Sequence, residues 1–180
     1  MKNKSTLETH RLILRAFETT DIGSLCQYRS LPKVFRYVVL GPETKKETTN
    51  FIKYAIAEGK KKTVLNYIWA VVSKETGKLI GDCNLPIIHP DQKEACLGYT
   101  LHPDFWNQGY ATEIAIRLIE FGLRDLKLHR IFATCDVKNI GSAKVLEKAG
   151  MRWEGTFRKN ILQKGKWRDT HQYAILSTKK

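Results

Sequence analysis

The feature that most constrains the fold is the segment of residues 94–137. Residues 94–101 have the composition of a strand, and apolar residues from Tyr110 onward recur at the spacing of one helix face. Those apolar positions are Ala111, Ile114, Ala115, Leu118, Ile119 and Gly122. Residues 130–137 again have the composition of a strand. This order predicts a βαβ crossover with two parallel strands, whose ligands bind at the carboxyl ends of the strands.

The rest of the chain predicts further strands and helices around the same sheet. Thr44 and Glu47 match the capping-box pattern at the start of a helix, and residues 75–78 form a turn between two β-rich segments. Asn139 and Gly150 are the expected start and stop of a later helix. The expected strands are 11–17, 68–73, 79–88, 94–101, 130–137, 151–161 and 171–176, and the expected helices are 22–31, 44–59, 110–122 and 139–149.

Length and composition favour one folded domain over residues 1–180. The 180 residues, 42% hydrophobic and 27% charged, fit a single core. The chain opens with a polar segment and has no uncharged apolar run of the roughly 18 to 20 residues that a membrane span needs. Four separated cysteines predict neither a disulfide nor a zinc site; they are Cys26, Cys83, Cys96 and Cys135. We therefore expect a soluble cytoplasmic protein that binds no metal and no membrane.

The net charge of +13 would attract nucleic acid, an anionic membrane, acidic proteins or a phosphate-rich cofactor. Lysine clusters are short and scattered, so a solvated surface explains the charge about as well as a binding patch does. Nucleic-acid modules usually show a zinc or helix-turn-helix signature, or basic residues interleaved with aromatics, and we find none. We do not expect nucleic acid as the partner. The oligomeric state stays open, a homodimer included.

The loop of residues 105–112, Phe-Trp-Asn-Gln-Gly-Tyr-Ala-Thr, runs into the strongest predicted helix. A glycine-containing loop at a helix N-terminus offers unpaired N–H groups and the positive end of the helix dipole, which together favour an anion such as a diphosphate. A simple turn role for Gly109 explains the same residues, and the loop alone does not decide between the two.

The context of the loop points to a known family. Residues 97–113, Leu-Gly-Tyr-Thr-Leu-His-Pro-Asp-Phe-Trp-Asn-Gln-Gly-Tyr-Ala-Thr-Glu, resemble motif A of the GNAT superfamily, in particular its ribosomal-protein N-terminal (alanine/serine) acetyltransferase branch. Further matches are His129-Arg130-Ile131, Asn139-Ile140-Gly141-Ser142, Leu146-Glu147-Lys148-Ala149-Gly150-Met151, Glu154-Gly155 and Gly165-Lys166-Trp167-Arg168-Asp169. The resemblance implies the α+β GNAT fold, a mixed central sheet of about six to seven strands with flanking helices, in which two splayed parallel strands form the CoA cleft.

The resemblance also implies a cosubstrate, acetyl-CoA, and the residues that hold it. The family pattern for phosphate is Gln/Arg-x-x-Gly-x-Gly/Ala; Gly109 and Ala111 match its later positions, and Trp106 stands at the first. Loop N–H groups would hold the pyrophosphate, and the end of the preceding strand would pair with the pantetheine arm. The implied residues are Tyr99, Thr100, Leu101, Asn107, Gln108, Gly109, Tyr110, Ala111, Thr112 and Asn139. A backbone N–H near Thr100 or Leu101 would face the thioester carbonyl and stabilise the oxyanion.

Asn139 and Ser142 are the catalytic candidates. Helix capping explains both residues about as well as catalysis does, because asparagine is a favoured N-cap and serine is ordinary in a first turn. Family members often place a tyrosine seven residues after this asparagine to protonate the leaving thiolate, and that position is Leu146 here. Some relatives in this branch use the serine, so the resemblance makes Ser142 the candidate acid.

A general base is not identified. Many relatives carry a glutamate two residues before the Gly-Tyr of the central strand, and this chain has Cys96 there. Glu94 lies on the same face by strand alternation, but a solvated strand end explains it equally well. The histidines at 89, 102 and 129 are expected to be structural.

A site without a strong base constrains the acceptor. Only a neutral amine attacks a thioester, and an α-amine of pKa about 7.7 to 8.0 is neutral in roughly 10% to 20% of molecules at pH 7, against well under about 0.1% for lysine. We therefore expect acetyl transfer to a primary amine, first of all the N-terminal α-amine of a protein. The alternatives are a small-molecule amine, such as an antibiotic, a polyamine or an amino acid, and a non-catalytic acyl-CoA-binding protein.

Overall fold

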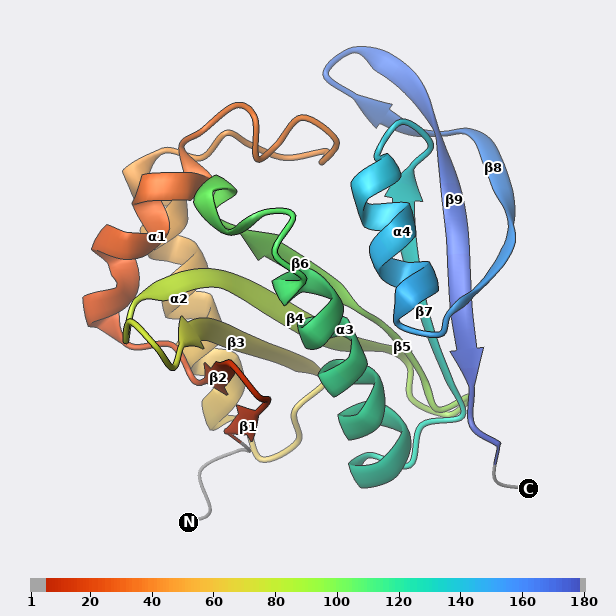
Figure 1. The fold of residues 1–180 in the computed structure, drawn as a ribbon, viewed down its shortest axis with the longest axis horizontal. Coiled ribbons are helices and arrows are strands. Elements are labelled where there is room, and N and C mark those ends of the chain that lie inside the picture. The colour runs from red at the N-terminus through yellow and green to blue at the C-terminus, as the bar shows by residue number, and fades with distance from the viewer. Residues whose placement is uncertain (1–5, 179–180) are drawn as a thin grey trace.

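The computed structural model describes residues 6–178 as one mixed sheet with helices on both faces (Figure 1). The strands of this part of the chain follow the order β1-β2-β3-β4-β5-β7-β9-β8, and β6 pairs with β4 beside β5. The strands are β1 (Leu7–Glu8), β2 (Leu12–Arg15), β3 (Asn66–Ser73), β4 (Leu79–His89), β5 (Glu94–Cys96), β6 (Gly98–Leu101), β7 (Arg130–Asp136), β8 (Arg152–Gln163) and β9 (Lys166–Leu176). The helices are α1 (Ile22–Arg29), α2 (Lys45–Lys60), α3 (Tyr110–Glu120) and α4 (Ile140–Lys148), with short turns at Thr19–Asp21, Pro103–Phe105 and Phe121–Asp125.

The predicted mixed sheet and flanking helices are confirmed. The sheet has nine strands over residues 6–178 rather than about six to seven, for two reasons. A two-residue strand, β1, pairs with β2, and the predicted strand 94–101 is interrupted at Leu97, which divides it into β5 and β6. The last two strands form a longer hairpin than predicted, because β8 continues through two register shifts to Gln163.

The two layers of helices bury different parts of the sheet. Leu25 of α1 and Ile52 of α2 pack with Ala70 of β3 in the smaller apolar cluster. In the larger cluster, Ile114 and Leu118 of α3 join residues of β4 and β7. In Figure 1, α3 and α4 lie in front of the sheet and α2 lies behind it. The predicted apolar stripe of α3 is thus its core face.

The parallel pair of strands separates at Leu97. β5 pairs in parallel with β7 from Glu94↔Arg130 to Cys96↔Phe132, and Leu97 N donates to Phe132 O at 2.9 Å. β6 then pairs with β4, and the parallel ladder of β5 with β7 does not continue into β6 in the described residues. Figure 1 shows β6 and β7 running apart with α3 and α4 in front. We call the interval between β6 and the second half of β7 the strand gap. It corresponds to the splayed pair of strands that the family resemblance implies.

Gly81 of β4 allows β6 to lie close enough to pair with it. Gly81 stands opposite Leu101, and a Cβ atom at this position would lie 2.4 Å from the backbone oxygen of Thr100. We predict that Gly81→Ala forces β4 and β6 apart and lowers the free energy of unfolding by about 1 to 3 kcal/mol, measured by urea denaturation. Gly155→Ala is the control, because a Cβ there meets no atom within 4 Å. Equal stability of the two variants would contradict the prediction.

Candidate active site

The loop before α3 has the backbone shape of an anion site. Asn107 and Gly109 have positive φ angles of 59° and 82°, and Gly109 is the N-cap of α3. The first intrahelical bond runs from Glu113 N to Gly109 O at 3.1 Å, so the N–H groups of the first turn before it need other partners. The residues that carry these groups are Tyr110, Ala111 and Thr112. The loop and first turn can therefore hold a diphosphate, with favourable interaction from the helix dipole.

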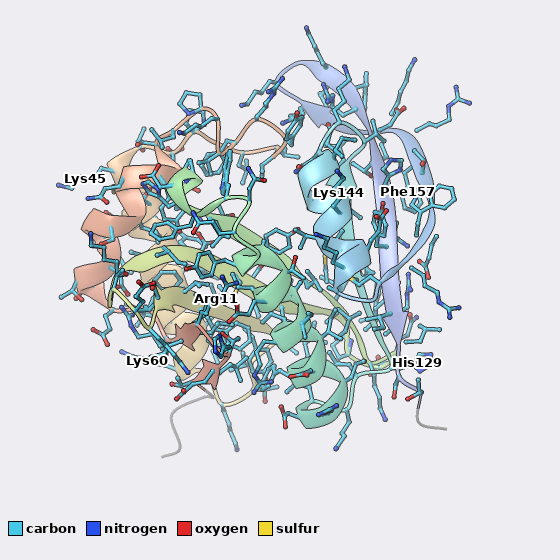
Figure 2. All side chains as sticks on the ribbon, in the orientation of Figure 1. Arg11, Lys45, Lys60, His129, Lys144 and Phe157 are labelled. Atoms are coloured by element: carbon cyan, nitrogen blue, oxygen red, sulfur yellow. The ribbon has the colours of Figure 1, made fainter. Side chains whose placement is uncertain are left out.

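Arg11 supports this loop from the neighbouring strand segment and was not among the predicted site residues. Its Nη1 donates to Gln108 O at 3.0 Å, its Nε pairs with Glu113 at 2.8 Å, and its guanidinium lies 4.1 Å from the Tyr110 ring centre. Figure 2 shows Arg11 beside the first half of α3. The ionised Glu113 offsets the charge of Arg11, so the contribution of Arg11 is to hold the loop backbone at Gln108 against α3. Glu113 lies within the segment that resembles the family, and Arg11 begins the expected strand 11–17; nothing in the sequence paired the two residues.

The open edge of β6 presents particular main-chain groups to the strand gap. His102 N donates to Ile80 O of β4 at 2.8 Å, and main-chain groups of successive strand residues point to opposite edges. The groups of Thr100 therefore point to β4, and those of Tyr99 and Leu101 point to the strand gap. Of the two N–H groups considered for the oxyanion, that of Leu101 faces the gap.

Asn139 and Ser142 lie at the start of α4, on the other side of the strand gap. Asn139 Oδ1 accepts a hydrogen bond from Ser142 N at 3.2 Å, which confirms the N-cap. The hydroxyl of Ser142 meets the phenol of Tyr99, with 2.8 Å between the two oxygens. The structure thus brings together three predicted site residues, Tyr99, Asn139 and Ser142, from both sides of the gap.

Leu146 and Cys96, at positions where relatives often carry catalytic side chains, are apolar in character here. Leu146 is only 1% exposed and belongs to the core. Burial raises the pKa of the Cys96 thiol to about 11, with a further contribution from Glu94, so the thiol stays protonated near neutral pH. Glu94 itself is held by Arg130 at 2.7 Å, where β5 and β7 are still paired.

The three histidines considered as bases have local roles or lie away from the gap. His102 Nδ1 accepts a hydrogen bond from Asp104 N at 3.2 Å. His89 lies 3.8 Å from Glu94, beside the paired end of β5. The backbone of His129 joins residues 93 and 177 through hydrogen bonds. These positions agree with the expectation that the three histidines are structural residues.

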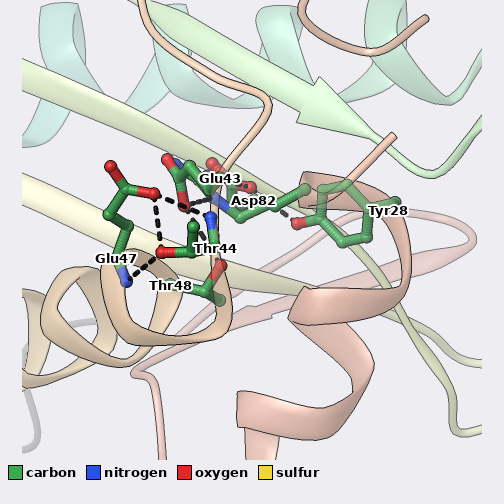
Figure 3. Close-up of polar contacts among 7 residues, drawn as sticks. Tyr28, Glu43, Thr44, Glu47, Thr48 and Asp82 are labelled. Carbon is green, nitrogen blue, oxygen red and sulfur yellow. Dashed lines mark hydrogen bonds and ion pairs between the residues drawn. The ribbon is translucent and has the colours of Figure 1, made fainter. Parts of the chain in front are cut away.

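A buried polar network on the opposite face of the sheet was not predicted (Figure 3). Asp82 of β4 accepts hydrogen bonds from Tyr28 at 2.6 Å and Arg29 at 2.9 Å, and Arg29 also pairs with Glu43 at 2.6 Å. Burial and the neighbouring Asp82 carboxylate raise the pKa of Tyr28 well above its usual value. The network fixes α1 and the end of the α1–α2 loop, just before α2, against β4, next to Thr100. An acidic residue inside the apolar segment 79–88 was the sequence signal for it.

The α1–α2 loop is joined to the β8–β9 hairpin at the same end of the molecule. Gln163 Nε2 donates to the backbone oxygens of Arg36 at 3.1 Å and Val38 at 2.8 Å, and Lys164 Nζ donates to Phe35 O at 3.1 Å. In Figure 1 this loop reaches toward the tip of the hairpin above the strand gap. Loop and hairpin therefore border the side from which an acceptor can approach.

Two kinds of structure are not found in residues 6–178. No helix there is long and apolar enough to cross a membrane. No group of three or more His, Cys, Asp or Glu side chains in that part of the chain is arranged to hold a metal ion.

The family model described as acetyltransferase (GNAT) domain matches residues 11–152. The chain therefore belongs to the GNAT family, and it is an acetyl-CoA-dependent N-acetyltransferase. It is 32% identical over 170 residues to the uncharacterized N-acetyltransferase YnaD of Bacillus subtilis, covering 94% of this chain and 96% of the relative. It is also 32% identical over 175 residues to the uncharacterized N-acetyltransferase p20 of Bacillus licheniformis, covering 95% and 96%.

Solved structures show the same fold. A GNAT-family acetyltransferase from Bacillus anthracis superposes with a TM-score of 0.87 at 32% identity, covering 96% of this chain and 98% of that chain. The ribosomal L7/L12 alpha-N-protein acetyltransferase RimL, in complex with coenzyme A, superposes with a TM-score of 0.84 at 20% identity and the same coverage. At this lower identity the likeness concerns the fold.

Gly109 tests the assignment of the loop to CoA. We predict that Gly109→Val weakens acetyl-CoA binding at least about tenfold, equivalent to about 1.4 kcal/mol, because a branched side chain disturbs a left-handed N-cap and crowds the anion. Isothermal titration calorimetry measures the affinity. Gly165→Val is the matched control, since Gly165 also has a positive φ, 75°, but lies in the β8–β9 turn. Unchanged affinity in a folded Gly109 variant, or equal losses in both variants, would contradict the assignment.

Glu113 links the N-terminal segment to the loop and makes this link depend on pH. Burial alone would raise its pKa, but hydrogen bonds from Thr9 and Arg11 and the charge of Arg11 outweigh burial, so the pKa lies below its usual value of 4.5. A lowered folded-state pKa means that the stabilisation is complete above pH 4.5 and is lost as pH falls through the folded value.

We predict that Glu113→Gln lowers the free energy of unfolding by about 1 to 2 kcal/mol at pH 7. The difference from wild type should shrink below about pH 4.5, because the wild-type carboxyl then also becomes neutral. Urea denaturation from pH 7 to pH 3 measures it. Glu120→Gln, at the other end of α3, is the control. A difference that stays constant down to low pH would exclude this role for the charge of Glu113.

Proposed function

We propose that this enzyme acetylates the N-terminal α-amine of proteins, as one catalytic domain spanning residues 1–180 and working in the cytoplasm. The observation that carries the proposal is the protonated Cys96 thiol at the position where many relatives carry a carboxylate. Without that base, the enzyme depends on an amine that arrives neutral. The four cysteines are free thiols, which agrees with a reducing compartment.

The proposed donor site uses both sides of the strand gap. The N–H groups of the loop hold the CoA pyrophosphate; the residues concerned are Asn107, Gln108, Gly109, Tyr110, Ala111 and Thr112. Pantetheine lies in the strand gap as an additional strand, against the main-chain groups of Tyr99 and the N–H of Leu101, which have no strand partner on that edge. The oxygen of Leu101 already accepts a hydrogen bond from the Trp106 indole at 2.9 Å. Asn139 contacts the arm from α4, and Ser142 acts on the leaving sulfur. No metal takes part.

The acceptor reaches the thioester between the α1–α2 loop and the β8–β9 hairpin. Two carboxylates that lie near the α1–α2 loop are already committed, because Asp82 binds Tyr28 and Arg29, and Glu43 binds Arg29. The difference in neutral fraction between an α-amine and a lysine at pH 7 corresponds to about 3.5 kcal/mol. The α-amine is the weaker base and therefore intrinsically the weaker nucleophile, which offsets part of this advantage. The preference for the α-amine remains.

Structural neighbours include enzymes for both kinds of acceptor. RimL is named for a ribosomal-protein α-amine, and a structure from Vibrio cholerae with a TM-score of 0.79 at 23% identity is named a putative ribosomal-protein-serine acetyltransferase. A spermidine N-acetyltransferase from Vibrio cholerae superposes with a TM-score of 0.80 at 22% identity. A polyamine or other small amine is therefore the second candidate acceptor.

A thiol-release assay with matched peptides distinguishes the acceptors. We predict that a peptide with a free α-amine and no lysine reacts at least about tenfold faster at pH 7 than the same peptide with a blocked N-terminus and one lysine. The gap should narrow toward pH 10, because lysine becomes neutral there. Spermidine is assayed in parallel.

Each result has one meaning. Equal rates for the two peptides at pH 7 would refute the preference for α-amines. Activity with spermidine alone would move the assignment to a small-molecule acceptor. An acidic limb near about pH 6 with a low-pKa amine would reveal an enzyme base and contradict the argument from Cys96.

A further inference from the structure

Tyr99 and Ser142 place two hydroxyl groups in contact at the strand gap. Tyr99 belongs to β6 and Ser142 to the first turn of α4, and their oxygens lie 2.8 Å apart. Since the N–H of Ser142 already caps the helix through Asn139, the hydroxyl of Ser142 is not needed for capping. In the described residues its hydrogen-bond partner is Tyr99.

We propose that Tyr99 is a positioning residue for the acetyl transfer: its phenol donates to Ser142 Oγ and so directs the Ser142 O–H into the strand gap, toward the leaving sulfur of CoA. This inference rests on the proposed donor site. A phenol is a stronger acid than an aliphatic alcohol, so the phenol takes the donor role in the pair. The serine proton is then left to point away from Tyr99. Donation to Ser142 also strengthens the bond that Ser142 makes in turn.

The surroundings of Tyr99 keep it in the neutral, donating form. Burial raises its pKa to about 12; the bond to Ser142 acts in the opposite direction, and Cys135 of β7 adds to the rise. Burial likewise raises the pKa of the Cys135 thiol to about 11, so this neighbour is uncharged as well. Around neutral pH the pair therefore carries no charge of its own before the reaction.

The chemistry needs hydrogen bonds and not a proton from Tyr99. The amine nitrogen bonds to the thioester carbon, and the carbon–sulfur bond breaks with its electron pair on sulfur. Complete proton transfer from a phenol of pKa about 12 to a thiolate whose conjugate thiol has a pKa of about 8.5 is unfavourable. Instead, the Ser142 hydroxyl, supported by Tyr99, donates a hydrogen bond to the developing thiolate, which finally takes the proton that the nitrogen releases as the amide forms.

This arrangement explains how the site functions with Leu146 in the core. Many relatives carry a tyrosine hydroxyl on this helix, at the position of Leu146, one turn after Ser142. In this chain the phenol of Tyr99 takes its place and reaches Ser142 from β6, on the other side of the strand gap. The contact between the Tyr99 and Ser142 hydroxyls therefore exists only while β6 and α4 keep their present separation.

Bound CoA provides a test that requires no acceptor. Ultraviolet absorbance of the thiolate gives the pKa of the CoA thiol on the enzyme. We expect the wild type to lower this pKa relative to free CoA, and Tyr99→Phe to raise it by about one unit above the wild-type value, because one bond to the charged form is weakened. Affinity for desulfo-CoA, which has no sulfur, should stay within about twofold of wild type, since only the sulfur contact changes.

Two further variants separate this role from a purely structural one. Tyr173→Phe also removes a tyrosine hydroxyl that bonds to α4, at Glu147, and should leave the thiol pKa unchanged. In Ser142→Ala the thiol pKa should rise at least as much as in Tyr99→Phe, and the double variant should match Ser142→Ala, because the two hydroxyls act in series. With a reactive amine, Tyr99→Phe should lower kcat about tenfold at unchanged KM.

The outcomes distinguish this inference from the proposed function. No binding of CoA by the wild type would refute the proposed donor site and the inference together. Normal CoA binding with the same thiol pKa in wild type and Tyr99→Phe would refute the inference alone. Additive effects in the double variant, or an equal effect of Tyr173→Phe, would also refute it.

Discussion

The rest of the structure depends on one change of hydrogen-bond partners, at Leu97. Up to Cys96 the chain is bonded to β7, and from Gly98 onward β6 is bonded to β4. Main-chain groups on the open edge of β6 then lack a strand partner, and unpaired buried backbone groups are costly. A ligand that supplies its own amides satisfies them. The fold thus leaves hydrogen-bonding groups for a ligand inside the central sheet, between α3 and α4, where we propose that the cosubstrate binds.

Local patterns predicted the helices and most strands from the sequence, whereas the assignment of the loop before α3 to CoA came from the family resemblance. The stripe of apolar residues in α3, the cap at Asn139 and the glycine at 109 are each encoded within a few neighbouring residues, so periodicity and cap chemistry were sufficient. The separation of this strand from strand 130–137 followed only from family resemblance, and its division into β5 and β6 was not predicted, because no pattern in residues 94–101 marks where partners change.

The contacts missed by the sequence join residues that are far apart in the chain. Arg11 reaches Glu113 across 102 positions, Tyr99 reaches Ser142 across 43, and Arg29 reaches Asp82 across 53. Residue types indicate that such groups need partners when buried, but they do not say which partner the topology supplies. Asp82 in an apolar strand was a sign of a partner, and only the position of α1 identified it as Tyr28 and Arg29.

The junction between the α1–α2 loop and the β8–β9 hairpin has a consequence for how the enzyme can diverge. Gln163 and Lys164 bind carbonyl oxygens of the loop, which every residue type possesses. Side chains at positions 36 to 40 can therefore be exchanged without loss of these bonds. The side chains that this loop presents can therefore vary, by evolution or by design, while the hydrogen bonds that hold the loop to the hairpin stay in place.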